Sequence, residues 1–268
     1  FPMGVTKGST TTCPTENLVS AYEMIDGTAF DWSNAEMAKD PYANRDPRLG
    51  MTVVYNGMAW PKTTPVEVFE GGKNGQPIKN ATTTGYYLRK YVNNSVTFEP
   101  GETTTSQQHN WILFRYAEIL LNYAEAVFER DGAISDEDLN LSLNLVRCRI
   151  NAKMPKLTNA FASTHDLDMR TEIRRERTIE LFNEGFRIDD LKRWKTAETE
   201  MPQDFLGIRW TGTEFQNKWP GVTNERNSDG FIILESGRKW EDKHYLYPLP
   251  TDQLQLNPNL KQNPGWGE

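Results

Sequence analysis

The chain has 268 residues, a formal net charge of −7 and a sequence pI near 5.2. No run of Lys and Arg stands unopposed by acidic residues, which argues against a protein that binds the phosphates of nucleic acids. The two cysteines, Cys13 and Cys148, are too few for a disulfide-rich scaffold and show no metal-binding spacing.

Aromatic residues make up 11% of the chain, although the mean hydropathy of −0.69 marks it as strongly polar. Aromatic side chains in a polar chain suit carbohydrate or peptide recognition, while core packing is the ordinary explanation for most of them. No window is long and apolar enough to predict a transmembrane helix. The first residues lack the regions of a signal peptide, so the mature start of the native protein is expected to be missing.

Residues 1–108 are rich in Pro, Gly, Asn and Thr, and we expect long loops with short strands that face a ligand. The strands are predicted over residues 51–55, 64–69 and 86–91. The Gly-rich segment 70–84 is predicted to be an exposed loop, because its glycines lack the spacing of a dinucleotide-binding motif.

Residues 109–195 are predicted to be helical. Between residues 110 and 130, apolar side chains recur at helical spacing in two adjacent stripes: Tyr116, Leu120, Tyr123 and Val127, and Ala117, Leu121, Ala124 and Phe128. Two such stripes predict a deeply buried helix. A second helix is expected from about Asp136 to Ile150, and the two would form an antiparallel hairpin of the tetratricopeptide kind, with no second copy at a regular repeat.

The stretch 172–194 combines many charged residues with regularly spaced apolar ones, and two interpretations of it remain open. In the first, a solvated face carries ion pairs such as Arg177–Glu180 and Asp189–Arg193. In the second, charged side chains are buried between packed helices and must be paired. The candidates for that structural network are Arg174, Arg177, Glu180, Glu184, Arg187 and Asp190. Gly185 is predicted to separate two helical segments.

Residues 196–268 are expected to be irregular. A hairpin with its turn at Ser236–Gly237 is predicted over residues 230–241. The Pro-rich tail, residues 245–266, is predicted to form a strap over the body of the protein.

Nine motifs are spread through almost the whole chain. They are Tyr22-Glu-Met-Ile-Asp-Gly27, Phe30-Asp-Trp32, Asn44-Arg-Asp-Pro-Arg-Leu49, Gly85-Tyr-Tyr-Leu-Arg-Lys-Tyr91, Arg115-Tyr-Ala-Glu-Ile-Leu-Leu-Asn-Tyr-Ala-Glu-Ala126, Leu143-Asn-Leu-Val-Arg-Cys-Arg149, Ile173-Arg-Arg-Glu-Arg-Thr-Ile-Glu-Leu181, Glu184-Gly-Phe-Arg-Ile-Asp-Asp-Leu-Lys-Arg-Trp194, and Tyr247-Pro-Leu-Pro with Asn257-Pro to Trp266. In this order they resemble the motifs of the SusD/RagB family of outer-membrane glycan-binding lipoproteins. The resemblance implies a mainly α SusD-like fold with tetratricopeptide-like hairpins, long loops and small β hairpins.

The resemblance also implies that this chain is the C-terminal half of a single SusD-like domain. It implies a SusC-like TonB-dependent transporter as partner and a place on the outer surface of the outer membrane. Attachment to the membrane would be through a lipid anchor that lies outside this chain.

Catalytic spacing is not found. Acidic pairs such as Asp189 and Asp190 are neighbours and cannot face each other across a scissile bond. The three histidines show no metal-ligand spacing, and no serine or cysteine lies in a nucleophile motif. We therefore expect no enzyme activity, no cofactor and no metal.

A sugar ring stacks on aromatic side chains while polar side chains bond its hydroxyl groups. The predicted ligand-binding residues, which packing could also explain, are Trp32, Tyr42, Tyr55, Trp60, Asn44 and Asn56. For a second loop cluster, Trp210, Phe215 and Trp219, we favour core packing over ligand binding as the explanation.

The leading hypothesis is a non-catalytic protein that captures an oligosaccharide or polysaccharide. The alternatives are a helical-repeat interaction scaffold without a ligand of its own, and a peptide-binding member of the same family.

Overall fold

The computed structural model describes residues 12–60, 65–94, 112–150, 154–216 and 226–267. These residues are mainly helical, with two small two-stranded sheets, which confirms the predicted fold class. The chain divides into two compact units, one comprising the described residues of 1–182 and 205–234, the other those of 183–204 and 235–268. The division into three sequence regions stays a prediction.

The first unit begins with three short helices, α1 (Glu16–Ala21), α2 (Ala35–Lys39) and α3 (Pro47–Thr52). The side chains of Asn34 and Asp46 accept backbone N–H groups at the starts of α2 and α3, which is the usual reason why such residues begin helices.

Two of the strands predicted in this region are present, although shorter than expected. Strand β1 (Val53–Val54) follows α3 directly and pairs antiparallel with β2 (Tyr87–Leu88). The strand predicted over residues 64–69 is wrong, because none forms in its described part, residues 65–69.

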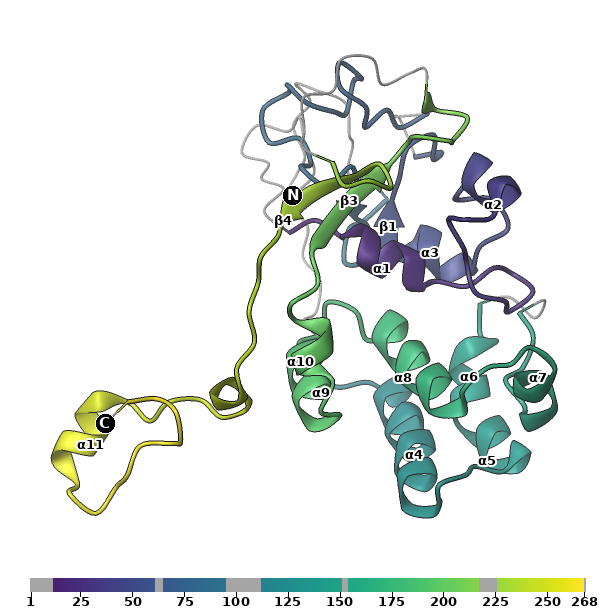
Figure 1. Cartoon of the computed structure of the whole chain (residues 1–268). Helices are drawn as coiled ribbons and strands as arrows, with labels where there is room; N and C mark the ends of the chain where they lie inside the picture. The colour runs from purple at the N-terminus through teal and green to yellow at the C-terminus, as the bar shows by residue number, and fades with distance from the viewer. Residues whose placement is uncertain (1–11, 61–64, 95–111, 151–153, 217–225, 268) are drawn as a thin grey trace. The chain divides into compact units, whose positions relative to one another are not determined.

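Helices α4 (Tyr116–Asp131) and α8 (Met169–Glu180) are the two long helices of this unit, and they pack against each other and on α6 (Leu143–Arg147). The group is drawn in teal and green in Figure 1, with α5 (Asp136–Leu141) and α7 (Asn159–Thr164). Gly132, at φ +69°, ends α4 in the left-handed conformation that glycine adopts without strain.

Two predictions about these helices are wrong. The single helix expected from Asp136 to Ile150 is divided into α5 and α6 by Ser142, whose backbone at φ −133° and ψ −98° is not helical. The deep burial expected for α4 holds only in part: Leu120, Leu121 and Ala124 are buried, whereas Tyr116 is 69% and Tyr123 44% exposed.

Strand β3 (Phe205–Arg209) packs on α1 and pairs with β4 (Phe231–Glu235). The local hairpin predicted around Ser236–Gly237 is therefore wrong, since β4 takes its partner from a segment more than twenty residues earlier. Ile208 of β3 lies so close to Gly85 that a Cβ atom at Gly85 would be 2.4 Å from its side chain.

The second unit contains α9 (Arg187–Arg193), α10 (Ala197–Glu200), a 3₁₀ turn η2 (Asp242–Tyr245) and α11 (Thr251–Leu256). The helical segment predicted from Arg187 is confirmed, and Gly185 just before it has φ +91°. The tail predicted to be irregular contains α11, and its position as a strap stays a prediction.

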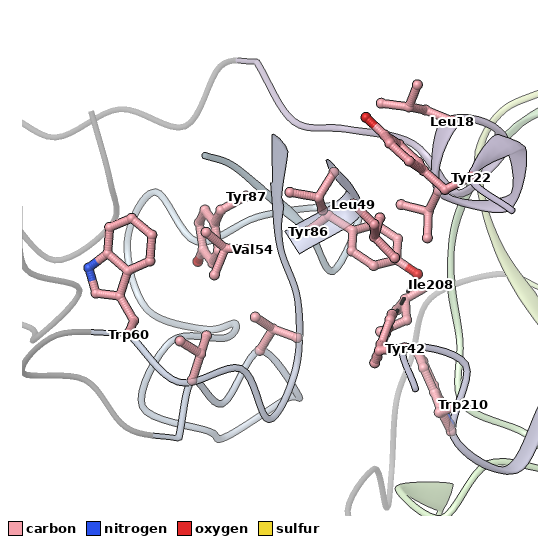
Figure 2. Close-up of a cluster of buried hydrophobic side chains, with 14 of the residues drawn as sticks. Leu18, Tyr22, Tyr42, Leu49, Val54, Trp60, Tyr86, Tyr87, Ile208 and Trp210 are labelled. Atoms are coloured by element: carbon pink, nitrogen blue, oxygen red, sulfur yellow. Dashed lines mark hydrogen bonds between the residues drawn. The ribbon is translucent and has the colours of Figure 1, made fainter. Parts of the chain in front are cut away.

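The core of the first unit is unusually aromatic (Figure 2). Tyr22, Trp60, Tyr86 and Tyr87 are each no more than 1% exposed, and they pack with aliphatic residues such as Leu49. Because these side chains come from the irregular first hundred residues as well as from β2, the loops of this region are anchored to one another by their own aromatic residues.

Within the described residues, no helix combines the length and the apolar character needed to cross a bilayer.

Candidate functional site

Tyr42 and Tyr55 form a stacked pair with ring centroids 4.2 Å apart and an interplanar angle of 16°. The Tyr42 ring is 9% exposed and belongs to the core, whereas Tyr55 is half-buried and presents part of its ring at the surface. Phe215 joins them, 6.4 Å from the Tyr42 ring. The structure thus brings together two of the predicted ligand-binding residues and one aromatic residue of the second loop cluster.

Trp32 is the centre of another aromatic group. Its half-buried indole meets Phe30 and Phe231 edge to face, with centroid distances of 5.1 and 5.4 Å. The Arg209 guanidinium lies 5.1 Å from the indole, within the range of a cation–π interaction. This group combines the loop before α2 with both strands of the β3–β4 pair.

The other predicted ligand-binding residues occupy different environments. Trp60 is 1% exposed in the core, and Asn56 is 4% exposed and accepts the backbone N–H of Val68 at 3.2 Å. Both environments are typical of packing residues. Asn44 is exposed in a turn at φ 53°, and its backbone carbonyl accepts the N–H of Ile25.

The second loop cluster does not form a separate shelf in the described residues. Trp210 is 3% exposed in the core and is covered by the Arg226 guanidinium at 3.7 Å. Trp219 lies outside the described residues.

A buried carboxyl group, that of Glu16, lies between the two aromatic groups. Its Oε1 accepts the Trp32 indole N–H at 3.1 Å, and its Oε2 accepts the hydroxyl of Tyr86. The Tyr42 hydroxyl in turn donates to that of Tyr86 at 3.3 Å. Burial raises the pKa of Glu16 above its ordinary value, in spite of these hydrogen bonds.

The most heavily charged part of the structure is buried beneath α8. Among the described residues, five carboxylates and five arginines form one connected set, here called the buried ion-pair network: Glu23, Asp46, Glu172, Glu176, Glu180, Arg48, Arg115, Arg147, Arg149 and Arg175. Its formal charges balance, so α8 can bury ionised side chains without a net charge.

Arg48 is at the centre of this network. Its guanidinium contacts Asp46 at 2.7 Å, Glu180 at 3.3 Å and Glu176, and its side chain is 3% exposed. Burial alone would raise the pKa of Glu176, but the charges of Arg48 and Arg147 outweigh it and hold that pKa below its ordinary value.

Glu180 and Arg177 were both predicted for a structural network and are both buried. They do not pair with each other as the solvated interpretation expected. Glu180 instead meets Arg115 at 2.7 Å and Arg149 at 2.8 Å, while Arg177 donates to Asn122 on α4 at 2.6 Å. A third candidate, Arg174, pairs with the partly exposed Glu129 on α4 at 3.1 Å.

The remaining three candidates lie in the second unit. Asp190 is buried and forms an ion pair with Arg193 at 2.7 Å, whereas the solvated interpretation expected Arg193 to pair with Asp189. Arg187 is exposed and lies 3.4 Å from Glu200. Glu184 is half-buried.

Among the described residues, no group of three His, Cys, Asp or Glu side chains gathers where it could hold a metal ion.

Sequence reasoning missed Glu16, Tyr86 and Arg209 as parts of the candidate site. Glu16 begins a helix of only six residues, so no periodic pattern marks it as buried. Tyr86 and Arg209 lie on segments that meet α1 only in the folded chain. Two family-like motifs were available as signals: Gly85-Tyr-Tyr-Leu-Arg-Lys-Tyr91 contains Tyr86, and the two aromatic residues of Phe30-Asp-Trp32 do meet.

The comparisons with known proteins place this arrangement in a family. A sequence model described as the SusD family matches residues 3–266. Among curated proteins, no sequence matches the chain.

Two crystal structures from Bacteroides fragilis resemble the chain. A SusD-like carbohydrate-binding protein is 27% identical, with a TM-score of 0.70, over 92% of this chain and 48% of its own. A second SusD-like protein is 26% identical, with a TM-score of 0.68, over 95% of this chain and 47% of its own. The chain thus spans about half the length of these structures. With a matching model over nearly all of its residues and a shared fold, the chain belongs to the SusD family.

Proposed function

We propose that the chain is part of a non-catalytic surface protein that captures an oligosaccharide or polysaccharide and delivers it to a TonB-dependent outer-membrane transporter. The observation that supports this ligand class is membership of the SusD family, together with 27% identity to a protein described as carbohydrate-binding. Because the chain spans about half of that protein, the proposal concerns a contribution to the ligand site.

Trp32 and Tyr55 are the proposed stacking residues. Each ring is half-buried, so it is held by neighbours and still offers apolar surface to the C–H face of a pyranose. Asn44 is proposed to bond sugar hydroxyls, since its carboxamide is exposed and has no hydrogen-bond partner among the described residues. Tyr42 supports Tyr55 from below by stacking.

Isothermal titration against a panel of oligosaccharides tests this proposal. Trp32→Ala and Tyr55→Ala are each expected to weaken the binding of the glycan that the wild type prefers by about tenfold, because each removes one stacking surface. Tyr116→Ala is the matched control, since this tyrosine is 69% exposed on α4, away from the proposed site. It is expected to leave affinity unchanged.

If both variants bind like the wild type, the proposed stacking residues are wrong. If the wild type binds peptides and no glycan, the ligand class is wrong and the protein is a peptide-binding member of the family. Appearance of cleaved product on prolonged incubation with the bound glycan would contradict the non-catalytic role.

The transporter partner and the lipid-anchored position on the outer surface are proposed from the family alone. Purification of the protein from outer membranes should bring a large TonB-dependent barrel with it. Recovery of the protein without any transporter would contradict this part of the proposal.

A second function, a helical interaction scaffold, is favoured by one observation. Apolar side chains around the start of α4 are exposed, among them Leu113 at 87%, Phe114 at 60% and Ile119 at 43%. A scaffold that binds through this face would keep its partner in Trp32→Ala and lose it in Ile119→Asp. The reverse pattern is expected for a partner held through the glycan site.

A further inference from the structure

Glu16 has a buried carboxyl group that forms no ion pair within the described residues. The residue is 2% exposed. The hydrogen-bond donors that reach it from the described part of the chain are all neutral: the Trp32 indole N–H at 3.1 Å and the Ser20 hydroxyl at 2.7 Å on Oε1, and the Tyr86 hydroxyl on Oε2. An isolated buried carboxylate is costly, so these donors offset only part of its desolvation.

The two oxygens of this carboxyl lead to different parts of the proposed site. One oxygen holds the indole of Trp32 directly. The other holds Tyr86, whose hydroxyl accepts from Tyr42 at 3.3 Å, and the Tyr42 ring stacks on Tyr55 at 4.2 Å. A chain of hydrogen bonds and one ring contact therefore joins the two half-buried rings through a single side chain.

Other charged groups face this carboxyl from the elements packed around α1. Arg45 is the nearest cation by electrostatic effect, but its guanidinium donates to the backbone carbonyls of Pro41, Val19 and Tyr22. Arg209 of β3 lies against the far side of the arrangement, over the indole. Neither arginine neutralises Glu16 by direct contact.

We infer that Glu16 is a positioning residue of the proposed glycan site, which fixes Trp32 directly and the Tyr42–Tyr55 stack through Tyr86. The inference rests on the proposed function, because it concerns the same rings. An indole N–H can only donate, so Trp32 faces acceptors, Oε1 of Glu16 and the Ser20 hydroxyl oxygen at 3.2 Å, whether or not the carboxyl is ionised. A tyrosine hydroxyl can donate or accept, so protonation of Glu16 can reverse the bonds along Tyr86 and Tyr42.

Two variants distinguish the positioning role of the Glu16 side chain from the effect of its charge. Glu16→Gln keeps a side-chain acceptor for the indole at position 16 and removes the titration, whereas Glu16→Leu removes that acceptor and leaves only the Ser20 hydroxyl of the two acceptors described. The readouts are glycan affinity and the ¹⁵N–¹H indole resonance of Trp32, assigned by its absence in Trp32→Phe. Glu36→Gln is the control, since this glutamate is exposed on α2.

In the wild type the Trp32 resonance is expected to shift with pH in a single transition above the ordinary carboxyl pKa. Asp31 cannot cause such a transition, because the Ser33 hydroxyl and N–H donate to it and hold its pKa below the ordinary value. Glu16→Gln should abolish the transition and bind the glycan within about threefold of the wild type. Glu16→Leu should move the resonance and weaken binding about tenfold, the equivalent of one lost hydrogen bond.

A Trp32 resonance that neither titrates nor responds to Glu16→Leu would overturn the inference. If Glu16→Leu does not fold, Tyr86→Phe tests the inference instead. This variant should leave the hydrogen bond of the Trp32 indole intact and still weaken glycan binding. Unchanged affinity would overturn the role of the second carboxyl oxygen. If the wild type binds no glycan, the proposed function fails, while the indole resonance alone still confirms or refutes the positioning of Trp32.

Discussion

Glu23 and Arg147 are 124 residues apart in the chain, yet their side chains form an ion pair of 2.5 Å with exposures of only 2% and 1%. Arg147 also reaches Glu176 of α8 at 3.4 Å. Such pairs add little net stability when complete, because desolvation offsets their attraction, but a broken pair leaves a buried charge uncompensated.

Glu176→Gln is therefore expected to lower the free energy of unfolding by about 3–5 kcal/mol, since it leaves Arg48 and Arg147 without their shared carboxylate. Urea unfolding measures the change. Glu129→Gln is the control: this glutamate also pairs with arginines but is 39% exposed, so its loss should cost about 1 kcal/mol or less. Equal small losses in both variants would show that the network is not energetically coupled.

Arg177→Ala tests the contact between α8 and α4. The Arg177 side chain is 5% exposed and donates to Asn122, so its removal should lower stability by more than about 1 kcal/mol, the ceiling of an exposed pair. Arg170→Ala serves as comparison, because that side chain is 46% exposed on the same helix. Thermal melts that show no difference between the two variants would mean that Arg177 contributes no more to stability than a solvated side chain.

Stability of Glu16→Gln relative to the wild type should depend on pH. The pKa of Glu16 in the folded chain is raised by burial above the ordinary 4.5, so its contribution to stability is present below that value and lost as pH rises through the folded pKa. The glutamine variant does not ionise, so its stability relative to the wild type should increase as pH rises toward neutrality. Melting temperatures over this range check the sign, and a constant difference would contradict it.

Gly85→Ala should be more destabilising than Gly132→Ala, although both glycines have positive φ angles of +83° and +69°. A methyl group at Gly85 would collide with Ile208 of β3, whereas nothing lies within 4 Å of one at Gly132. The Gly132 variant should cost about 1 kcal/mol for its backbone, and the Gly85 variant a further 1–3 kcal/mol for overpacking. Equal losses by denaturant unfolding would exclude the contribution of this contact.

The helices with a strong local signal could be predicted from the sequence. Spacing of apolar residues predicted α4, which ends at Gly132. The same spacing could not tell that Tyr116 and Tyr123 are exposed, because periodicity reports that a face is apolar and not what covers it. The break at Ser142 also carries no strong local signal, since serine is tolerated inside helices.

Contacts between distant segments could not be predicted. The sequence pointed to charged residues of α8 as a possible buried network but not to Arg48 or Glu23, whose segments contain no helical pattern that includes them. For the same reason the partner of β4 was assigned to a neighbouring segment instead of β3. In the candidate site, aromatic residues from several loops of the first hundred residues were predicted together, yet Trp60 is buried while Trp32 and Tyr55 are partly exposed.

The balance of five carboxylates and five arginines beneath α8 constrains how this protein can be redesigned. Replacing Arg48 with an apolar residue removes one partner from each of three acids, and replacing Glu176 removes one partner from each of two arginines. The losses of stability from such changes are not additive. Replacing both partners of an ion pair together should therefore cost less stability than the sum of the two single replacements. Substitutions in the interior under α8 should therefore be made together, with equal numbers of acidic residues and arginines replaced.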